Sequence, residues 1–363
     1  MKKLIKLCLL MFVCSLMFVG CTKDSGVLDV GIIFPGDASG RWEQDKAQFE
    51  ALLSEQGFKA EVITAEDSAA EEEAATELLN KGIKVLVYCP LDGEKAASVC
   101  DKAKYAGVKV ISYDRLIRNT NAVDYYVTFD SEEVGSKQGF FIVDNRPASE
   151  GIPLYLYGGS ITDNNAFLFF EGAWEALQPY IVDGTFVIAN SNAAKKYQNK
   201  NELEREEISE IFEEIATGWD AKTASDLARR DLNASNLKGD ICILAPNDTT
   251  SRAIGSVFLA DKNVSSMVIT GQDAEAKTIN AIINGKQSMT VFKNTKILAK
   301  DTCDTINKIF SGKHIDTDII FDNGVKEVIG ICSPITVVTK DNYIEELIDI
   351  GYYTKEDIQN AGI

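Results

Sequence analysis

An aspartate and an arginine stand side by side at the end of a predicted strand. In VISYDRLIRNT (residues 110–120), Val110 and Tyr113 follow the pattern of a buried strand, and Asp114 and Arg115 come directly after it. A carboxylate accepts and a guanidinium donates, so the two can form charge-assisted, often bidentate hydrogen bonds with neighbouring hydroxyl groups. The alternative is an ion pair on the surface that binds nothing.

Polar side chains follow other predicted strands as well. Apolar runs lead into PGDASGRWEQD, PLDG, GGSITDNN, APNDTT and GQDAE. Open parallel sheets bind ligands at the carboxyl ends of their strands, so these segments are expected to meet there. Asp, Asn, Arg and Gln with a nearby Trp suit a sugar, whose hydroxyls donate and accept while an aromatic ring covers its C–H face.

The sequence argues against several other kinds of site. Neither GxGxxG nor GxxxxGK[ST] occurs, and DLNASNLKGD (231–240) lacks the Gly and Glu that a calcium loop requires. The only histidine, His314, lies in a predicted loop, which argues against Ser-His-Asp chemistry and most metal hydrolases. No cofactor and no metal are expected. A net charge of −18 argues against nucleic acid and anionic membrane surfaces as partners.

The N-terminal segment has the pattern of an export signal. Residues 1–20 combine a basic start with an apolar run, and Gly20 precedes Cys21. This resembles a bacterial lipoprotein signal, with Cys21 as the lipidated residue and residues 21–27 as a tether, although Phe18 stands where such signals usually carry Leu. A transmembrane anchor is the alternative, but the apolar run is short for a span.

From residue 28 onward, apolar strand-like runs alternate with helical periodicity. Strands separated by helices predict parallel βαβ units, and a chain of 363 residues predicts two lobes. Five cysteines of the body lie apart without a CxxC pair and are expected to be small buried hydrophobes: Cys89, Cys100, Cys242, Cys303 and Cys332. The charged stretch 199–218 predicts a solvated helix that packs one apolar stripe, with Ile208, Ile211, Phe212 and Ile215, on the second lobe.

Eight motifs in order carry a resemblance to a known family. GRWEQD, ISYDRLIRN, YYVTFD, GGSITDNNAFLFFEGA, LQPYIVDG, GQDAEAKTINAIINGKQSMTVFKNT, DNGV and GYYTKED resemble the type I periplasmic sugar-binding proteins of ABC importers. The multiple-sugar-binding (galactose/glucose) and xylose-binding proteins are the most similar. The resemblance spans residues 28–355. It implies an α/β fold of two Rossmann-like lobes with parallel sheets, joined by a three-strand hinge.

The resemblance also implies domain bounds and a binding site between the lobes. The first lobe would comprise 28–128 and 292–328, and the second 129–291 and 329–363. Nine ligand-binding positions carry over to this chain by motif: Arg41, Trp42, Asp114, Arg115, Asn165, Trp219, Asn247, Asp273 and Lys293. Arg41, Asp114 and Arg115 would bond hydroxyls from the first lobe, with Trp42 walling the pocket. For Trp42, ordinary helix packing is the alternative.

The remaining positions would act from the second lobe and the hinge. Asn165, Asn247 and Asp273 would reach the sugar from the second lobe, and Lys293 would contribute near the hinge. Trp219 is similar to a tryptophan that stacks on the sugar ring in this family. The charged stretch upstream of Trp219 is longer than is usual there.

The resemblance implies a monomeric, extracytoplasmic receptor, held to the membrane only by its lipid. Hinge closure would trap a monosaccharide, and the closed form would meet an ABC permease. The main alternative is another ligand for the same class of receptor: a pentose, an inositol or a furanosyl signal. A glycosidase using Asp114 and Asp273 is a second alternative. A sugar-sensing repressor would need a helix-turn-helix in place of the signal.

Overall fold

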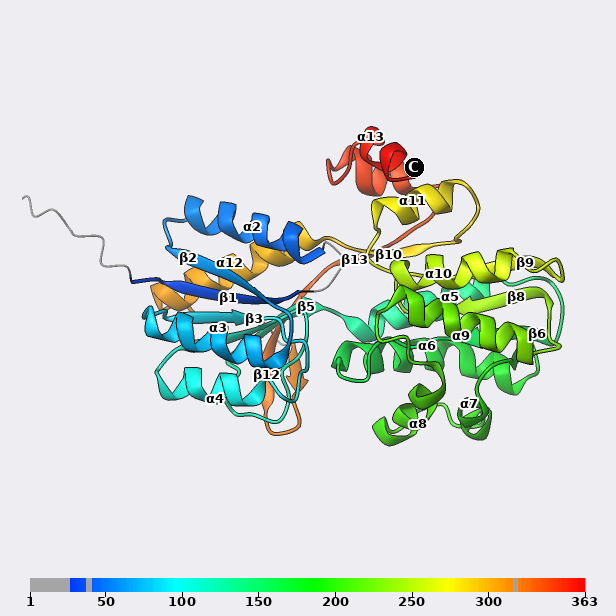
Figure 1. The fold of residues 1–363 in the computed structure, drawn as a ribbon, viewed down its shortest axis with the longest axis horizontal. Coiled ribbons are helices and arrows are strands. Elements are labelled where there is room, and N and C mark those ends of the chain that lie inside the picture. The colour runs from blue at the N-terminus through cyan, green and yellow to red at the C-terminus, as the bar shows by residue number, and fades with distance from the viewer. Residues whose placement is uncertain (1–26, 37–40, 316, 318, 363) are drawn as a thin grey trace, which may run out of the picture.

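A computed structural model describes residues 27–36, 41–315, 317 and 319–362 of the chain. The predicted signal peptide, the lipidation residue Cys21 and nearly all of the tether lie outside the described residues. In the described part of the chain, no helix is both long enough and apolar enough to cross a membrane. The polypeptide forms two α/β lobes that lie side by side, with β5, β10 and β13 between them (Figure 1).

The first lobe is built on a seven-stranded sheet. Its strand order is β11-β12-β5-β4-β3-β1-β2, and every pairing is parallel except that of β11 with β12. The strands are β1 Val30–Pro35, β2 Ala60–Ala65, β3 Val85–Tyr88, β4 Lys109–Tyr113, β5 Tyr125–Phe129, β11 Ile320–Asp322 and β12 Glu327–Ser333. Its helices are α2 Arg41–Glu55, α3 Ser68–Asn80, α4 Ala97–Tyr105 and α12 Thr295–Ser311.

Alternation along the strands places helices on both faces of this sheet. Ile32 and Phe34 of β1 pack with α2 and α12, whereas Ile33 between them packs with α3 and α4. Successive side chains of a strand point to opposite faces, so a strand covered on both sides is apolar throughout. The apolar strands and amphipathic helices predicted from the sequence follow from this arrangement.

The second lobe is built on a four-stranded parallel sheet of order β7-β6-β8-β9. The strands are β6 Ile152–Leu156, β7 Phe186–Ile188, β8 Gly239–Leu244 and β9 Val264–Ile269. The helices are α5 Ser131–Asn145, α6 Asn164–Val182, α7 Asn192–Tyr197, α8 Arg205–Ile215, α9 Ala221–Ala234 and α10 Asp248–Leu259. Side chains of α5 to α8 pack on one face of the sheet, and those of α9 and α10 pack on the other.

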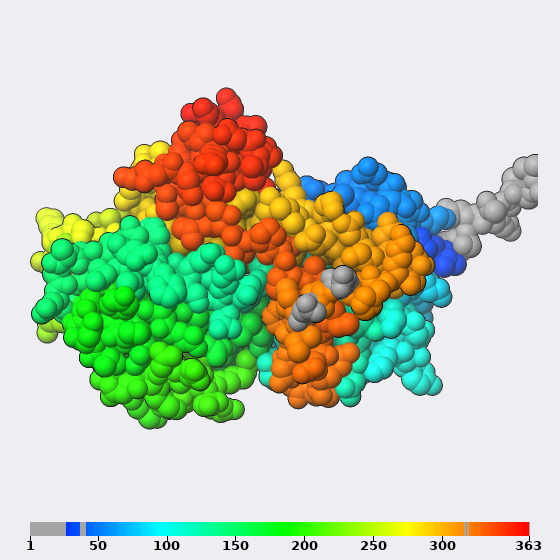
Figure 2. Space-filling view, turned by 180° about the vertical axis from the view of Figure 1, so that it is seen from behind, coloured from blue at the N-terminus to red at the C-terminus, as the bar shows by residue number. Residues whose placement is uncertain are grey.

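A third, smaller unit lies over the connections between the lobes. Strand β10 (Thr290–Lys293) pairs antiparallel with β13 (Ile335–Val338). These strands share an apolar cluster with α11 (Ala276–Ile283), the π-helix η1 (Ile344–Asp349) and α13 (Lys355–Ala361). In Figure 2 the C-terminal segment forms a red knob above the junction of the green and orange regions.

The structure corrects three details of the sequence-based expectation. The expected helix 199–218 is shorter, since α8 spans only Arg205–Ile215, although all four residues of its predicted apolar stripe are buried. The sequence analysis missed α5, α7, α11 and β12. Residues 329–333 pair with β5, so this part of the chain belongs to the first sheet rather than the second lobe.

The expected burial of the cysteines agrees with the structure. Four of the five are buried, Cys332 is partly exposed, and no disulfide joins any of these five.

Glycine permits a close contact between α5 and α6 in the second lobe. A Cβ on Gly172 of α6 would lie 2.1 Å from the carbonyl oxygen of Glu132 on α5. We expect Gly172→Ala to destabilise the protein by about 1–3 kcal/mol, because backbone cannot yield as a flexible side chain does. The thermal unfolding midpoint measures this effect.

Gly255 in α10 provides the matched control. The nearest atom to its Cβ would be Met267 Cε at 3.4 Å, an ordinary contact. Gly255→Ala is therefore expected to keep or raise the midpoint, since alanine favours helix by about 1 kcal/mol. Equal midpoints for the two variants would contradict the close helix contact.

Candidate functional site

Asp114 and Arg41 form the centre of the candidate site. Asp114 follows β4 and is buried, and Arg41 is the first residue of α2, the helix that follows β1. Nη2 of Arg41 donates to Oδ2 of Asp114 at 2.5 Å. Burial acts to raise the pKa of Asp114, but the charges of Arg41 and Lys293 outweigh it and hold this pKa below its ordinary value. Asp114 is therefore a buried carboxylate that can only accept hydrogen bonds.

Asp114 and Arg115 do not pair with each other as a surface ion pair would. Nε of Arg115 lies 3.1 Å from Oδ2 of Asp163 in the second lobe, and its Nη1 donates to the carbonyl oxygen of Pro90 at 3.1 Å. The adjacent residues therefore engage different partners. The low pKa of Asp114 also argues against a general acid at this position, which a glycosidase would need.

Trp42 combines packing with a position beside both arginines. Its ring stacks on Phe34 with centroids 5.7 Å apart, and only 6% of the residue is exposed. The guanidinium carbons of Arg41 and Arg115 lie 4.6 Å and 5.4 Å from the ring centroid. The packing alternative accounts for the burial of Trp42, and the two cations add a reason for an aromatic ring here.

Asn165 connects the second lobe to this centre. Asp163 caps the N-terminus of α6 by accepting from the backbone N–H of Asn165. Asn165 therefore lies in the first turn of α6, and its side chain reaches the first lobe. Nδ2 of Asn165 donates to the carbonyl oxygen of Asp114 at 2.7 Å. The hydroxyl of Tyr126 lies 3.0 Å from Oδ1 of Asn165 and 2.8 Å from the same carbonyl oxygen, and these two acceptors share its single proton.

Asp273 and Lys293 add an ion pair in which Lys293 is buried and Asp273 is partly exposed. Nζ of Lys293 lies 3.0 Å from Oδ1 of Asp273, and Nη1 of Arg41 lies 4.0 Å from the same oxygen. Lys293 is only 5% exposed, between the rings of Phe129 and Phe169. Burying a cation is costly unless a carboxylate pairs with it, so Asp273 and Lys293 depend on each other.

Trp219 reaches the neighbourhood of this pair through Phe169. The two rings meet edge to face with centroids 6.3 Å apart, and Phe169 also lies beside Lys293. A Cβ on Gly159 would lie 2.2 Å from the indole ring, so only glycine allows this placement. The indole Nε1 is buried and has no hydrogen-bond partner among the described residues.

Asn247 is the predicted site residue with the weakest link to the others. Its side chain caps α10 by accepting from the backbone N–H and hydroxyl of Thr250. The next residue, Asp248, donates its N–H to the carbonyl oxygen of Gln272, which places Asn247 near the turn that carries Asp273. Eight of the nine predicted residues are thus linked by direct contacts or through Phe169, and Asn247 only through the backbone of its neighbour Asp248.

Three residues at this site have a left-handed backbone. The φ angles of Asp114, Trp219 and Asp273 are 61°, 63° and 96°. Residues other than glycine adopt such angles at a cost, and they concentrate at functional sites.

Sequence reasoning missed further residues that link the two lobes. Arg118 of the first lobe and Arg205 of α8 both donate to Oδ1 of Asn164, at 2.9 and 2.8 Å. The backbone N–H of Gly93 donates to the carbonyl oxygen of Thr162 at 3.2 Å. The only available signal was the first Asn of TDNN, Asn164, which stands directly before the predicted ligand-binding residue Asn165. Within the described ranges, no group of three or more His, Cys, Asp or Glu side chains could hold a metal ion.

Comparison with known proteins identifies the class to which this fold and site belong. Residues 30–314 match the family model described as "Periplasmic binding protein domain". The chain therefore belongs to the periplasmic binding protein family, a class of solute-binding proteins rather than enzymes. This confirms the family and the fold class that the sequence motifs predicted.

Two curated relatives span nearly the whole chain. The multiple sugar-binding periplasmic receptor ChvE of Rhizobium radiobacter is 33% identical and covers 99% of this chain and 100% of its own length. The D-xylose-binding periplasmic protein of Haemophilus influenzae is 31% identical and covers 98% of this chain and 99% of its own length.

A solved structure has higher identity. The carbohydrate transporter solute-binding protein of Chloroflexus aurantiacus, in complex with D-glucose, is 48% identical with a TM-score of 0.88. The match covers 91% of this chain and 98% of that one.

The contact through Asn164 leads to a prediction about the two lobes. Asn164→Ala would remove the acceptor that Arg118 and Arg205 share, leaving two cations facing each other across the lobes. Hydrogen bonds to charged groups contribute about 1.5–3 kcal/mol. The population of molecules with separated lobes, relative to those with closed lobes, should therefore rise roughly tenfold or more. Small-angle scattering of the ligand-free protein should then give a larger radius of gyration. Asn233→Ala, at an exposed position on α9, is the control, and identical curves for both variants would contradict this role.

Proposed function

We propose that this protein works outside the cytoplasm, where it captures a monosaccharide between its two lobes and delivers it to an ABC permease. The ligand we infer is an aldohexose such as glucose or galactose. Removal of residues 1–20 and lipidation of Cys21 would hold the receptor at the membrane near its permease. The protein would act as a monomer and bind neither cofactor nor nucleic acid.

One observation carries this proposal. Charged and amide side chains from the carboxyl ends of both sheets converge on Asp114, in a chain that is 48% identical to a protein solved with D-glucose. The convergence needs both lobes, because Arg41 and Asp114 come from one and Asn165 from the other. A hydroxyl-bearing ring would find acceptors, donors and aromatic rings within this one cluster.

Each residue has a role that follows from its chemistry. Asp114 accepts from hydroxyls, and Arg41 and Arg115 donate to them. Asn165 donates and accepts, and Trp219 covers the C–H face of the sugar with its ring.

The ion pair near the hinge and the cap of α10 complete the set. Asp273 and Lys293 bind further hydroxyls as an acceptor and a donor. Asn247 adds an amide from the start of α10.

A pentose is the second candidate ligand. The D-xylose-binding relative is 31% identical over nearly the full length of both chains, so the same scaffold accommodates both kinds of ligand in this family. A hexose differs from a pentose by one hydroxymethyl group, and whether the site leaves room for that group decides between them.

Binding would couple to hinge motion of the lobes. An open form admits the sugar on one lobe, and closure brings donors such as Asn165 from the other and expels water. The permease would recognise the closed form. Incorporation of labelled palmitate into the wild type but not into Cys21→Ser would test the lipid anchor.

A thermal-shift panel on the mature domain tests the ligand class. We expect D-glucose or D-galactose to raise the unfolding midpoint, since a ligand at ~1,000 times its dissociation constant stabilises by about 4 kcal/mol. A shift with D-xylose alone would favour the pentose. No shift with D-glucose, D-galactose, D-xylose, L-arabinose, D-ribose or myo-inositol would contradict the proposed ligand class.

Asp114→Asn tests the central carboxylate. Asn tolerates a left-handed backbone and preserves the shape of the side chain, so the fold should remain while the charge is lost. A charge-assisted hydrogen bond contributes about 1.5–3 kcal/mol, so the dissociation constant for the sugar should rise roughly 10- to 100-fold in calorimetry. Asp226→Asn, at an exposed position on α9, makes the same chemical change as a control. Unchanged affinity in Asp114→Asn would remove this residue from the site.

A further inference from the structure

A fully buried aspartate lies directly behind the candidate site and is not among its predicted ligand-binding residues. Asp45 is 0% exposed and stands one helical turn after Arg41 on α2. Its Oδ2 lies 3.8 Å from Nε of Arg41. The hydroxyl of Tyr113 donates to the same Oδ2 at 2.9 Å.

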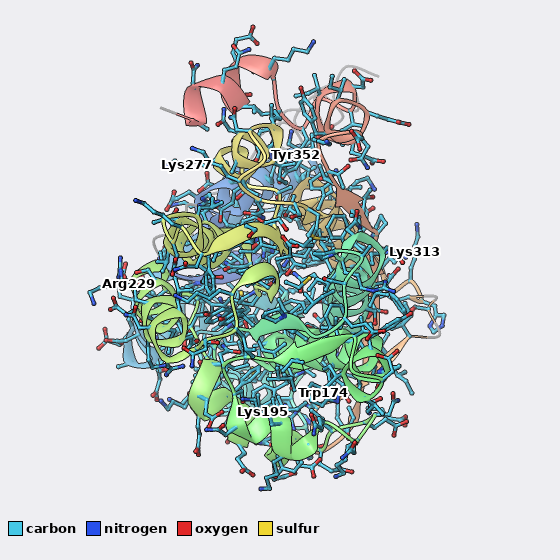
Figure 3. All side chains as sticks on the ribbon, turned by 90° about the vertical axis from the view of Figure 1, so that its right-hand side faces the viewer. Trp174, Lys195, Arg229, Lys277, Lys313 and Tyr352 are labelled. Carbon is cyan, nitrogen blue, oxygen red and sulfur yellow. The ribbon has the colours of Figure 1, made fainter. Side chains whose placement is uncertain are left out.

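The surroundings of Asp45 come from α2, β4, α12 and the connection between η1 and α13. Arg41 belongs to the same helix, while Tyr113 and Asp114 lie at the end of β4. The hydroxyl of Thr295, at the start of α12, faces the carboxylate. Tyr352 lies 3.4 Å from that hydroxyl, and Figure 3 labels it below the C-terminal helices, beside α11. Arg41 is the single cation of this group.

The two carboxylates engage different parts of one guanidinium. Asp114 accepts from Nη2, whereas Asp45 lies on the Nε side. A planar guanidinium with carboxylates on two of its sides has its rotation restricted. The carboxylate of Asp273 lies farther away, 4.0 Å from Nη1, so Asp45 is the carboxylate that restrains the Nε side of the guanidinium.

We propose that Asp45 is a positioning residue that holds the guanidinium of Arg41 in the orientation needed to bind the sugar. It does so without touching the ligand, through Arg41 and through the hydroxyl of Tyr113 beside Asp114. The inference rests on the proposed sugar-binding function and adds to it one determinant of affinity.

Protonation of Asp45 should then have opposite effects on affinity and on stability. Burial, opposed by the charge of Arg41 and the hydrogen bond from Tyr113, raises the pKa of Asp45 to about 6. Above that pH the carboxylate is charged and positions Arg41, so the sugar binds tightly. An acid whose pKa is raised by folding adds stability below its unfolded pKa, near 4, and loses this stability as the pH rises through 6. Acidification from pH 7 to 5 should therefore weaken sugar binding. Over the same range, the contribution of Asp45 to the free energy of unfolding of the ligand-free protein should rise.

Asp45→Asn provides the direct test. We expect about a tenfold higher dissociation constant for D-glucose at pH 7.5 by calorimetry, together with an equal or higher unfolding midpoint of the ligand-free protein. The difference in affinity between wild type and variant should shrink as the pH falls below 6, because the wild type then becomes neutral as well. Glu50→Gln removes an exposed charge from the same helix and should leave affinity and pH profile unchanged.

Tyr113→Phe gives an independent readout if Asp45→Asn folds poorly. It keeps the carboxylate but removes a hydrogen bond that lowers the pKa of Asp45. The pH at which glucose affinity falls should move upward, which a purely structural role of Asp45 would not cause.

The outcomes separate this inference from the function on which it rests. Wild-type affinity in Asp45→Asn would overturn the inference and leave the function intact. An unshifted pH profile in Tyr113→Phe would also overturn it. A wild-type protein that binds none of the monosaccharides would overturn both.

Discussion

The structure around the candidate site depends on the pairing of buried charges. Arg41 lies between Asp45, Asp114 and Asp273, and Lys293 shares Asp273 with it. Each ion that loses its water costs several kcal/mol, so the removal of one partner leaves another buried without compensation. The array therefore constrains the ends of β4 and β10, the start of α2 and the turn after β9 together. The same preorganised donors and acceptors can exchange part of their mutual contacts for the hydroxyls of a sugar.

This array spans segments that are far apart in the chain. Asp114 and Arg41 belong to the first lobe, while Asn165 and Asp163 reach across from the N-terminus of α6. The helix caps contribute to this geometry, because Asp163 and Asn247 stand at the starts of α6 and α10, where strand ends meet helices. Left-handed backbone at Asp114 and Asp273 then turns the side chains inward at a cost of roughly 1–2 kcal/mol each, which the surrounding ion pairs offset.

Much of the fold could be read from local patterns. The hydrophobic pattern predicts burial where the period of a strand or helix is visible in the sequence. Examples are the apolar run that ends at Tyr113 and the apolar stripe of α8. Helix α5 and strand β12 were missed since their sequence patterns are weak. Helix α5 contains two buried glycines, Gly135 and Gly139, and in β12 the apolar Ile329 is exposed while the buried position beside it is Gly330, so the sequence does not show the alternation of burial. The family motifs predicted the residues of the candidate site, and eight of these nine residues are linked in the structure. The motifs did not predict Asp45 or Asn164, which act through other residues.

The sequence alone determined the alternation of strands and helices, the acidic character of the chain and the residue types at the strand ends. These are local properties, set by periodicity, capping and composition. Only the tertiary structure decided which charges pair. The neighbours Asp114 and Arg115 turn to different partners, Arg41 and Asp163, because the left-handed turn after β4 and the approach of α6 separate their side chains. Pairing energies depend on distance and burial, and both arise only when the two sheets lie together.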